Sequence, residues 1–221
     1  MGAKTWMLVY ADASIPETLA ARPDLDRARA LDLAGRLFPA ESLQPLPDGD
    51  LSRTSPRGRD ICAGCYADVS VIAAEELAID VPSKLPARFL DEARSRRVVL
   101  HAMHSVVDWF AYAIWQDGQL QRSLSLSPDR GVIEDLGERL AFETAYWAGH
   151  HPALDPDDED PDEPYPLPFH PLELGDAALA ELFGYVLEGP PERARFDPES
   201  VPLLSFRRAR RQPWWAFWRT S

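Results

Sequence analysis

The sequence predicts an α+β fold in which a mainly antiparallel sheet of about five or six strands carries two or three helices packed on one face. Of the 221 residues, 45% are hydrophobic, which is enough apolar surface for one sizeable core. Short runs of β-branched and aromatic residues follow one another through tight turns and do not alternate regularly with helices. We therefore expect a single globular domain over residues 1–206, followed by a tail over residues 207–221.

The expected strands begin with Thr5–Ala11, an apolar run bounded by polar residues, as in a buried strand. Four further runs have the composition of strands: Val69–Ala73, Arg97–Met103, Trp109–Gln116 and Gln119–Leu126. Asp117-Gly118 joins the last two and predicts a hairpin, because a type I′ turn needs residues that tolerate positive φ. A single helix over residues 98–116 is the alternative, but the β-branched content and the Asp-Gly turn favour strands.

Three segments are predicted as helices. The first starts at Pro23-Asp24, and Pro39 ends it. The second is the short segment Pro86–Ala93. The third is capped by Asp176 and carries one apolar stripe made of Leu179, Leu182, Phe183, Val186 and Leu187. Residues 39–60 contain four prolines and show little periodicity, so we expect mainly loop there.

The charge of the chain narrows its classes of partner. The formal net charge is −13, and a field of this sign repels phosphate backbones, which argues against nucleic-acid binding. Seven of the 36 acidic residues lie at positions 155–163, inside a proline-rich loop over residues 152–171. No apolar run approaches the roughly 18 residues of a membrane span. The apolar run near the N-terminus is too short for a signal peptide. We therefore expect a cytoplasmic protein.

Several segments together resemble a family of uncharacterised actinobacterial proteins. They are Met1–Ala11 (MGAKTWMLVYA), Pro82–Phe89 (PSKLPARF), His101–Ala113 (HAMHSVVDWFAYA), Arg122–Asp129 (RSLSLSPD) and Pro164–Gly175 (PYPLPFHPLELG). The resemblance covers most of residues 1–206. It implies a bacterial cytoplasmic setting, and it implies no activity, cofactor or catalytic residue.

The segment His101–Asp108 is the first candidate site, because imidazoles and a carboxylate are the groups used for metal binding and for acid–base chemistry. On a strand, His101 and His104 point to opposite faces. A kink after His104 would bring His104, Ser105 and Asp108 to one rim. The favoured interpretation is a hairpin corner in which Ser105 and Asp108 bind turn amides. The alternative is a metal-dependent, hydrolase-like enzyme with metal ligands drawn from His101, His104, Asp108, His150, His151 and His170.

Other enzyme signatures are missing from the sequence. Cys62 and Cys65 form a lone CxxC pair with no second pair of ligands, so we interpret them as structural or incidental thiols. The chain has no Gly-x-Ser-x-Gly elbow, P-loop or dinucleotide fingerprint. We therefore expect no cofactor and favour a protein that is not an enzyme.

The tail is the second candidate site, because it combines basic and aromatic residues: Arg207, Arg208, Arg210, Arg211, Trp214, Trp215, Phe217 and Trp218. Burying one large aromatic side chain is worth about 2–3 kcal/mol, so these rings need an acceptor. An anionic membrane surface or single-stranded nucleic acid would each accept Arg and Trp. The acidic loop at residues 155–163 favours docking on the protein itself or on an unidentified protein partner. The sequence thus predicts an interaction or regulatory module, with peripheral membrane attachment as a further alternative.

Overall fold

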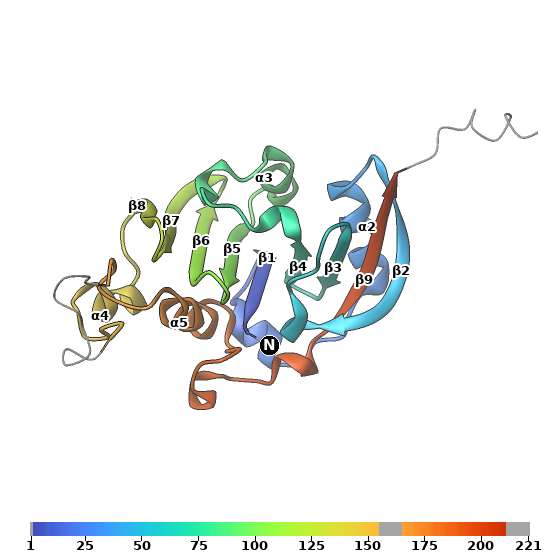
Figure 1. The fold of residues 1–221 in the computed structure, drawn as a ribbon. Helices are drawn as coiled ribbons and strands as arrows, with labels where there is room; N and C mark the ends of the chain where they lie inside the picture. Colours follow the sequence, from blue (N-terminus) through green and yellow to red (C-terminus); the bar gives the residue numbers. More distant parts are fainter. Residues whose placement is uncertain (1, 155–164, 211–221) are drawn as a thin grey trace, which may run out of the picture.

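The structure is a computed structural model that describes residues 2–154 and 165–210. One nine-stranded antiparallel sheet organises the described chain, in the strand order β2-β9-β3-β4-β1-β5-β6-β7-β8 (Figure 1). The strands are β1 (Lys4–Ala11), β2 (Glu41–Asp50), β3 (Asp60–Cys65), β4 (Val69–Ala74), β5 (Arg97–His104), β6 (Trp109–Gln116), β7 (Gln119–Ser127), β8 (Gly131–Gly137) and β9 (Pro202–Arg210). β2 and β8 form the two edges.

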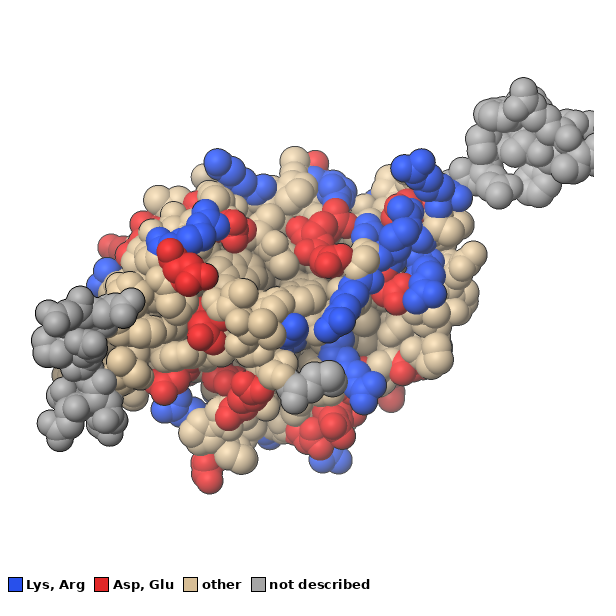
Figure 2. All heavy atoms as spheres, in the orientation of Figure 1, with Lys and Arg blue, Asp and Glu red and all other residues tan. Residues whose placement is uncertain are grey.

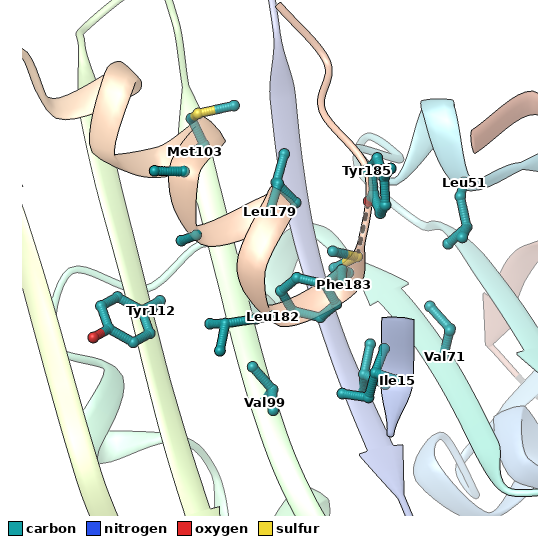
Figure 3. Packing of buried hydrophobic residues seen from close by; sticks show 14 of the residues in the cluster. Ile15, Leu51, Val71, Val99, Met103, Tyr112, Leu179, Leu182, Phe183 and Tyr185 are labelled. Atoms are coloured by element: carbon teal, nitrogen blue, oxygen red, sulfur yellow. Dashed lines mark hydrogen bonds between the residues drawn. The ribbon is translucent and has the colours of Figure 1, made fainter. Parts of the chain in front are cut away.

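Helices cover both faces of this sheet. They are α1 (Ile15–Ala20), α2 (Arg27–Leu37), α3 (Ala87–Ala93), α4 (Thr144–Trp147) and α5 (Pro171–Phe183). Met7 and Val9 of β1 point into a core shared with α1, α4 and α5, whereas Leu8 and Tyr10 point into a core shared with α2 and α3. Figure 3 shows Leu179, Leu182 and Phe183 projecting from α5 into the first of these cores, close to side chains of the sheet.

The predicted fold class is wrong in its numbers and its layers. In the described residues the sheet has nine strands instead of five or six, and five α-helices instead of two or three pack on two faces instead of one. Central strands such as β1 and β4 are apolar at nearly every position, because a strand covered on both faces has no polar side. That continuous apolar pattern was the signal for a second helical layer.

Strand β2 was missed because Pro45 and Pro47 indicate a loop. Proline is tolerated on an edge strand, where its missing N–H costs no ladder bond, and among the described strands β2 pairs with β9 alone. Strand β9 was missed in turn because part of it, Arg207–Arg210, belongs to the segment predicted as a tail. The omissions of β2 and β9 are linked, since these strands pair with each other; β3 and β8 were not predicted either.

Helix α5 begins earlier than predicted. His170 precedes Pro171 and caps the helix, with Nδ1 accepting a hydrogen bond from the N–H of Leu172 at 3.3 Å. Asp176 lies inside the helix and accepts the N–H of Leu187 at 3.1 Å, so it holds the segment that follows α5. Among the described residues, no helix is long and apolar enough to cross a bilayer.

Candidate functional site

His101 is fully buried at the centre of the sheet. Its Nδ1 lies 2.6 Å from the hydroxyl of Thr5, and its Nε2 lies 3.0 Å from the carbonyl oxygen of Gly175 in α5. Because a carbonyl can only accept, Nε2 carries the proton and Nδ1 accepts from Thr5. Burial lowers the pKa of His101 to about 4, so the ring is neutral at pH 7 and joins β1, β5 and α5.

His104 ends β5 on the opposite face, as the period of a strand requires. Its ring stacks on Trp6 with the centroids 6.0 Å apart, and its Nδ1 accepts the N–H of Val106 at 3.2 Å. Partial burial, together with the charge of Lys4, lowers the pKa of His104. His104 is therefore a neutral ring that fixes the start of the β5–β6 turn, which we define as residues 104–108.

His170 and Asp108 come together although they are far apart in sequence. Nε2 of His170 lies 3.7 Å from Oδ2 of Asp108, and both side chains are partly exposed. Nδ1 of His170 accepts the N–H of Leu172, so Nε2 carries the ring proton, at a distance from Asp108 that is longer than a hydrogen bond. This contact joins the start of α5 to the β5–β6 turn.

These hydrogen bonds bear on the metal-dependent alternative. In His101, His104 and His170 alike, Nδ1 accepts a hydrogen bond and Nε2 carries the proton. A metal ion needs a free ring lone pair, and as hydrogen-bonded here none of these three rings offers one. Consistently, the described part of the chain contains no group of three or more His, Cys, Asp and Glu side chains placed to hold a metal ion.

The other predicted histidines lie at α4. His151 stacks on Tyr146 with ring centroids 4.3 Å apart, and the N–H of His150 donates to the carbonyl of Ala145 at 2.9 Å. The structure thus distributes the predicted ligands over the sheet centre, the β5–β6 turn and the end of α4.

The β5–β6 turn itself has an unusual combination of features. Asp108 has a φ of 45°, in the left-handed region that few residues other than glycine adopt. Between His104 and Asp108, Val106 and Val107 are 73% and 51% exposed, which makes them the most exposed large hydrophobic side chains of the described chain. Sequence analysis did not single out these two valines, although an apolar pair inside a turn was the available signal.

Two buried hydroxyls border this turn without a partner in the described residues. They are Oγ of Ser105 and the phenol oxygen of Tyr165. The ring of Tyr165 stacks on His170 at 6.2 Å, and burial with the charge of Asp108 raises the pKa of Tyr165 to about 12, so its hydroxyl stays protonated. Ser105 therefore does not bind a turn amide through its hydroxyl, whereas its N–H donates to the carbonyl of Ala3 at 3.1 Å.

The predicted partner-binding arginines are only partly described. Arg207 forms a bidentate pair with Asp60 at 2.7 and 2.9 Å, and Arg208 contacts Glu76 at 2.8 Å and Glu41 at 3.4 Å. Arg210 ends β9 opposite Glu41. In Figure 2 basic side chains gather at the β2–β9 end of the sheet with acidic ones among them. The remaining tail residues, Arg211, Trp214, Trp215, Phe217 and Trp218, lie outside the described residues, as does the acidic loop at 155–163.

The two cysteines point to opposite faces of β3. Cys62 lies in the core of α5 and Cys65 in the core of α2 and α3, because three residues on a strand span the pleat. Burial raises the pKa of both thiols. Both are free cysteines, so the CxxC pattern here is two separate buried thiols.

Comparisons with known proteins place the chain in a family. No curated protein and no solved structure matches it. The sequence profile of a family of unknown function matches residues 5–206, which include all nine strands of the sheet except the ends of β1 and β9. The chain therefore belongs to the family of unknown function DUF6928.

Proposed function

We propose that the protein is a protein-binding module that contacts its partner through the β5–β6 turn. The observation that carries the proposal is the exposure of Val106 and Val107 in a turn that the rest of the molecule holds in place. Burying one valine is worth about 1.5–3 kcal/mol, so two adjacent valines can form the centre of a contact.

The turn is fixed before any partner arrives. His104 stacks on Trp6, the N–H of Ser105 binds Ala3, and the N–H of Val107 binds the carbonyl of His104 at 3.3 Å. Asp108 keeps its left-handed backbone while facing His170. A turn held in this way loses little conformational entropy on binding, which leaves more of the hydrophobic gain as affinity. Backbone strain of this kind also tends to occur at functional sites.

The chemistry of the turn indicates the kind of partner. Its valines require an apolar groove, and Asp108 together with the −13 charge of the chain favours a groove with a basic rim. The pKa of His104 is lowered by its partial burial, so its ring adds apolar contact area without a competing charge at pH 7. The interaction module predicted from the sequence thus acquires a specific surface in this proposal.

Site-specific photo-crosslinking tests it. A photoreactive amino acid is placed at Val106 in the full chain inside cells, and in a matched control at Leu31, which is 48% exposed on α2. We expect the same partner band from Val106 and from Val107, and not from Leu31. Identical bands from all three positions, or none from the two valines, would contradict the proposal.

A quantitative test follows once that partner is isolated. Val106→Ser combined with Val107→Ser should weaken its affinity by at least 10-fold, because each substitution removes roughly 1 kcal/mol or more of buried apolar area. Val132→Ser on the β8 edge, 44% exposed, is the control and should leave affinity unchanged. All variants should have the melting temperature of the wild-type chain, since the exchanged side chains are exposed.

A truncation that tests the tail has to begin at Arg211, because an earlier cut removes part of β9.

A further inference from the structure

A cavity of about 430 Å³ lies between α2 and α3, over the ends of β1 and β3. Four arginines line it, Arg29 and Arg36 from α2 and Arg94 and Arg96 from the segment between α3 and β5. Three carboxylates, Asp12, Asp32 and Glu92, share the lining, so the cavity has a small excess of basic groups in a chain with a net charge of −13. The cavity has the size of a site for a small molecule.

The four arginines differ in how far they are neutralised. Arg36 forms a bidentate pair with Glu92 at 3.0 and 2.7 Å and also contacts Asp32, and Arg96 lies 3.6 Å from Glu92. Arg29 donates to the carbonyl of Tyr66 at 3.1 Å. Within the described residues, neither Arg29 nor Arg94 forms an ion pair with a carboxylate. Two guanidinium groups at the cavity therefore have donors available for an anion.

Arg94 has a backbone conformation that normally requires glycine. Its φ is 56° and its ψ is −111°, and the N–H of Arg96 binds the carbonyl of Ala93 at 3.0 Å. These values describe the second residue of a type II′ turn, a position dominated by glycine. An arginine there keeps a strained backbone, and this residue is part of the cavity lining. Strain retained at a cavity wall is a feature of ligand sites.

The remaining lining narrows the ligand. Cys65 and Ser70 are buried at the cavity, and burial raises the pKa of the Cys65 thiol, so neither group repels an anion. The carboxylate of Asp12 at the end of β1 can accept hydrogen bonds from hydroxyl groups. The lining residues in the described chain include no aromatic ring on which a base could stack. The lining therefore offers arginine donors for an anion, a carboxylate acceptor for hydroxyl groups, and no ring for a base. A phosphate ester of a polyhydroxylated compound that has no nucleobase fits these three features.

We propose that this cavity binds a small hydroxylated phosphomonoester, such as a sugar phosphate. Arg29 and Arg94 bind the phosphate oxygens, since guanidinium groups match phosphate geometry. Arg36 and Arg96, held by Glu92, supply the surrounding positive potential. Asp12 accepts hydrogen bonds from the hydroxyl groups of the ligand. Its negative charge disfavours ligands that carry a second anionic group next to it. The site is separate from the β5–β6 turn and does not depend on the proposed partner contact.

The first experiment measures the melting temperature of the full chain with millimolar inorganic phosphate, ribose 5-phosphate, glucose 6-phosphate, glucose and citrate. We expect a concentration-dependent increase with the two sugar phosphates, a smaller one with phosphate, and none with glucose. An increase with citrate as large as that with the sugar phosphates would overturn the assignment of a phosphomonoester. No increase with any phosphorylated compound would overturn the site.

Arg94→Gly separates ligand binding from a structural role. It relieves the strained turn, so the free protein should melt about 2–4 °C higher, while sugar phosphate affinity should fall by about 10-fold or more. Arg22→Gly is the matched control, because Arg22 also has a positive φ, 51°, and lies outside the cavity. That control should melt higher as well and retain full affinity. Unchanged affinity in Arg94→Gly, or equal losses in both variants, would overturn the proposal.

Asp12→Ala tests the preference for hydroxyl groups. Removing this carboxylate should tighten the binding of inorganic phosphate, because one negative charge leaves the cavity. The same change should reduce the preference for sugar phosphate over phosphate. An unchanged ratio of the two affinities would show that Asp12 does not contact the ligand and would overturn this part of the assignment.

Discussion

Two bidentate arginine–carboxylate pairs have nearly the same geometry in very different surroundings. Arg122 of β7 donates to Glu143 at 2.9 and 2.6 Å, with the side chains 1% and 0% exposed. Arg207 of β9 donates to Asp60 at 2.7 and 2.9 Å, with the side chains 57% and 28% exposed. Because the distances match, burial and the further partners that surround a buried pair should decide what each pair contributes to stability.

The buried pair is also the centre of a larger network. Three further groups donate hydrogen bonds to the carboxylate of Glu143. They are the hydroxyl of Tyr112 at 2.5 Å, the backbone N–H of Leu140 at 2.8 Å and the indole N–H of Trp147 at 3.2 Å. Burial by itself raises the pKa of Glu143, but the hydrogen bonds from Arg122 and Tyr112 outweigh it and hold this pKa below its usual value. The network anchors α4 and the chain before it to β6 and β7.

The largest effect is expected for Glu143→Ala. It leaves Arg122 buried with Asp135 as its remaining carboxylate partner in the described chain, and it strands the hydroxyl of Tyr112. The free energy of unfolding should fall by about 3–5 kcal/mol, measured by urea denaturation. Combining Glu143→Leu with Arg122→Met should recover part of that loss, because the unpaired charge is removed. A loss below about 1 kcal/mol for Glu143→Ala would show that burial does not set the value of the pair.

The next largest effect concerns the neutral buried His101. Because its pKa is lowered from 6.5 to about 4 by burial, the unfolded chain binds a proton between these two pH values and the folded chain does not. Stability from this group is therefore present above pH 6.5 and is lost as the pH falls towards 4. Between pH 7 and pH 5 the free energy of unfolding should decrease by about 2 kcal/mol from His101 alone.

His101→Gln measures this contribution, since glutamine can retain polar contacts with Thr5 and Gly175 but does not titrate. The variant should lose about 2 kcal/mol less than the wild-type chain between pH 7 and pH 5 in urea denaturation. If both chains lose the same free energy, His101 does not titrate as its burial requires.

A difference between local and long-range determinants explains which parts of the fold the sequence could predict. The turn at Asp117-Gly118 follows from two adjacent residues, and both have positive φ, 50° and 73°. The opposite directions of His101 and His104 follow from the two-residue period of a strand. In contrast, Pro45 and Pro47 indicate a loop until β2 is known to be an edge strand, which depends on the position of β9.

The candidate sites show the same limit. The approach of His170 to Asp108 depends on α5 crossing β5 and β6, and the arginine cavity depends on α2 and α3 sharing one face of the sheet. No local spacing links Arg29 with Arg94, so neither site could be assembled from motifs. The sequence identified Asp108 and its neighbours as a segment of interest, but the topology determined their chemistry.

A smaller effect is expected for Tyr112→Phe. The substitution removes one hydroxyl donor to Glu143 and keeps the aromatic ring, which stacks on Phe110 at 5.6 Å. Glu143 retains Arg122 and the N–H of Leu140, so the free energy of unfolding should fall by about 1 kcal/mol in urea denaturation. An effect as large as that of Glu143→Ala would mean that the hydroxyl, and not the arginine, is the main partner of the carboxylate.

The smallest effect is expected for Arg207→Ala. The carboxyl of Asp60 has a lowered pKa because the guanidinium of Arg207 donates to it, so the contact exists, but water and salt screen both groups. The urea midpoint of Arg207→Ala should equal that of the wild-type chain in 0.15 M salt. A decrease comparable to that of Tyr112→Phe would show that the exposed pair does hold β9 against β3. In that case register, with Arg207 directly opposite Asp60, would matter as much as burial, and the bidentate geometry shared with Arg122 would be a guide to stability after all.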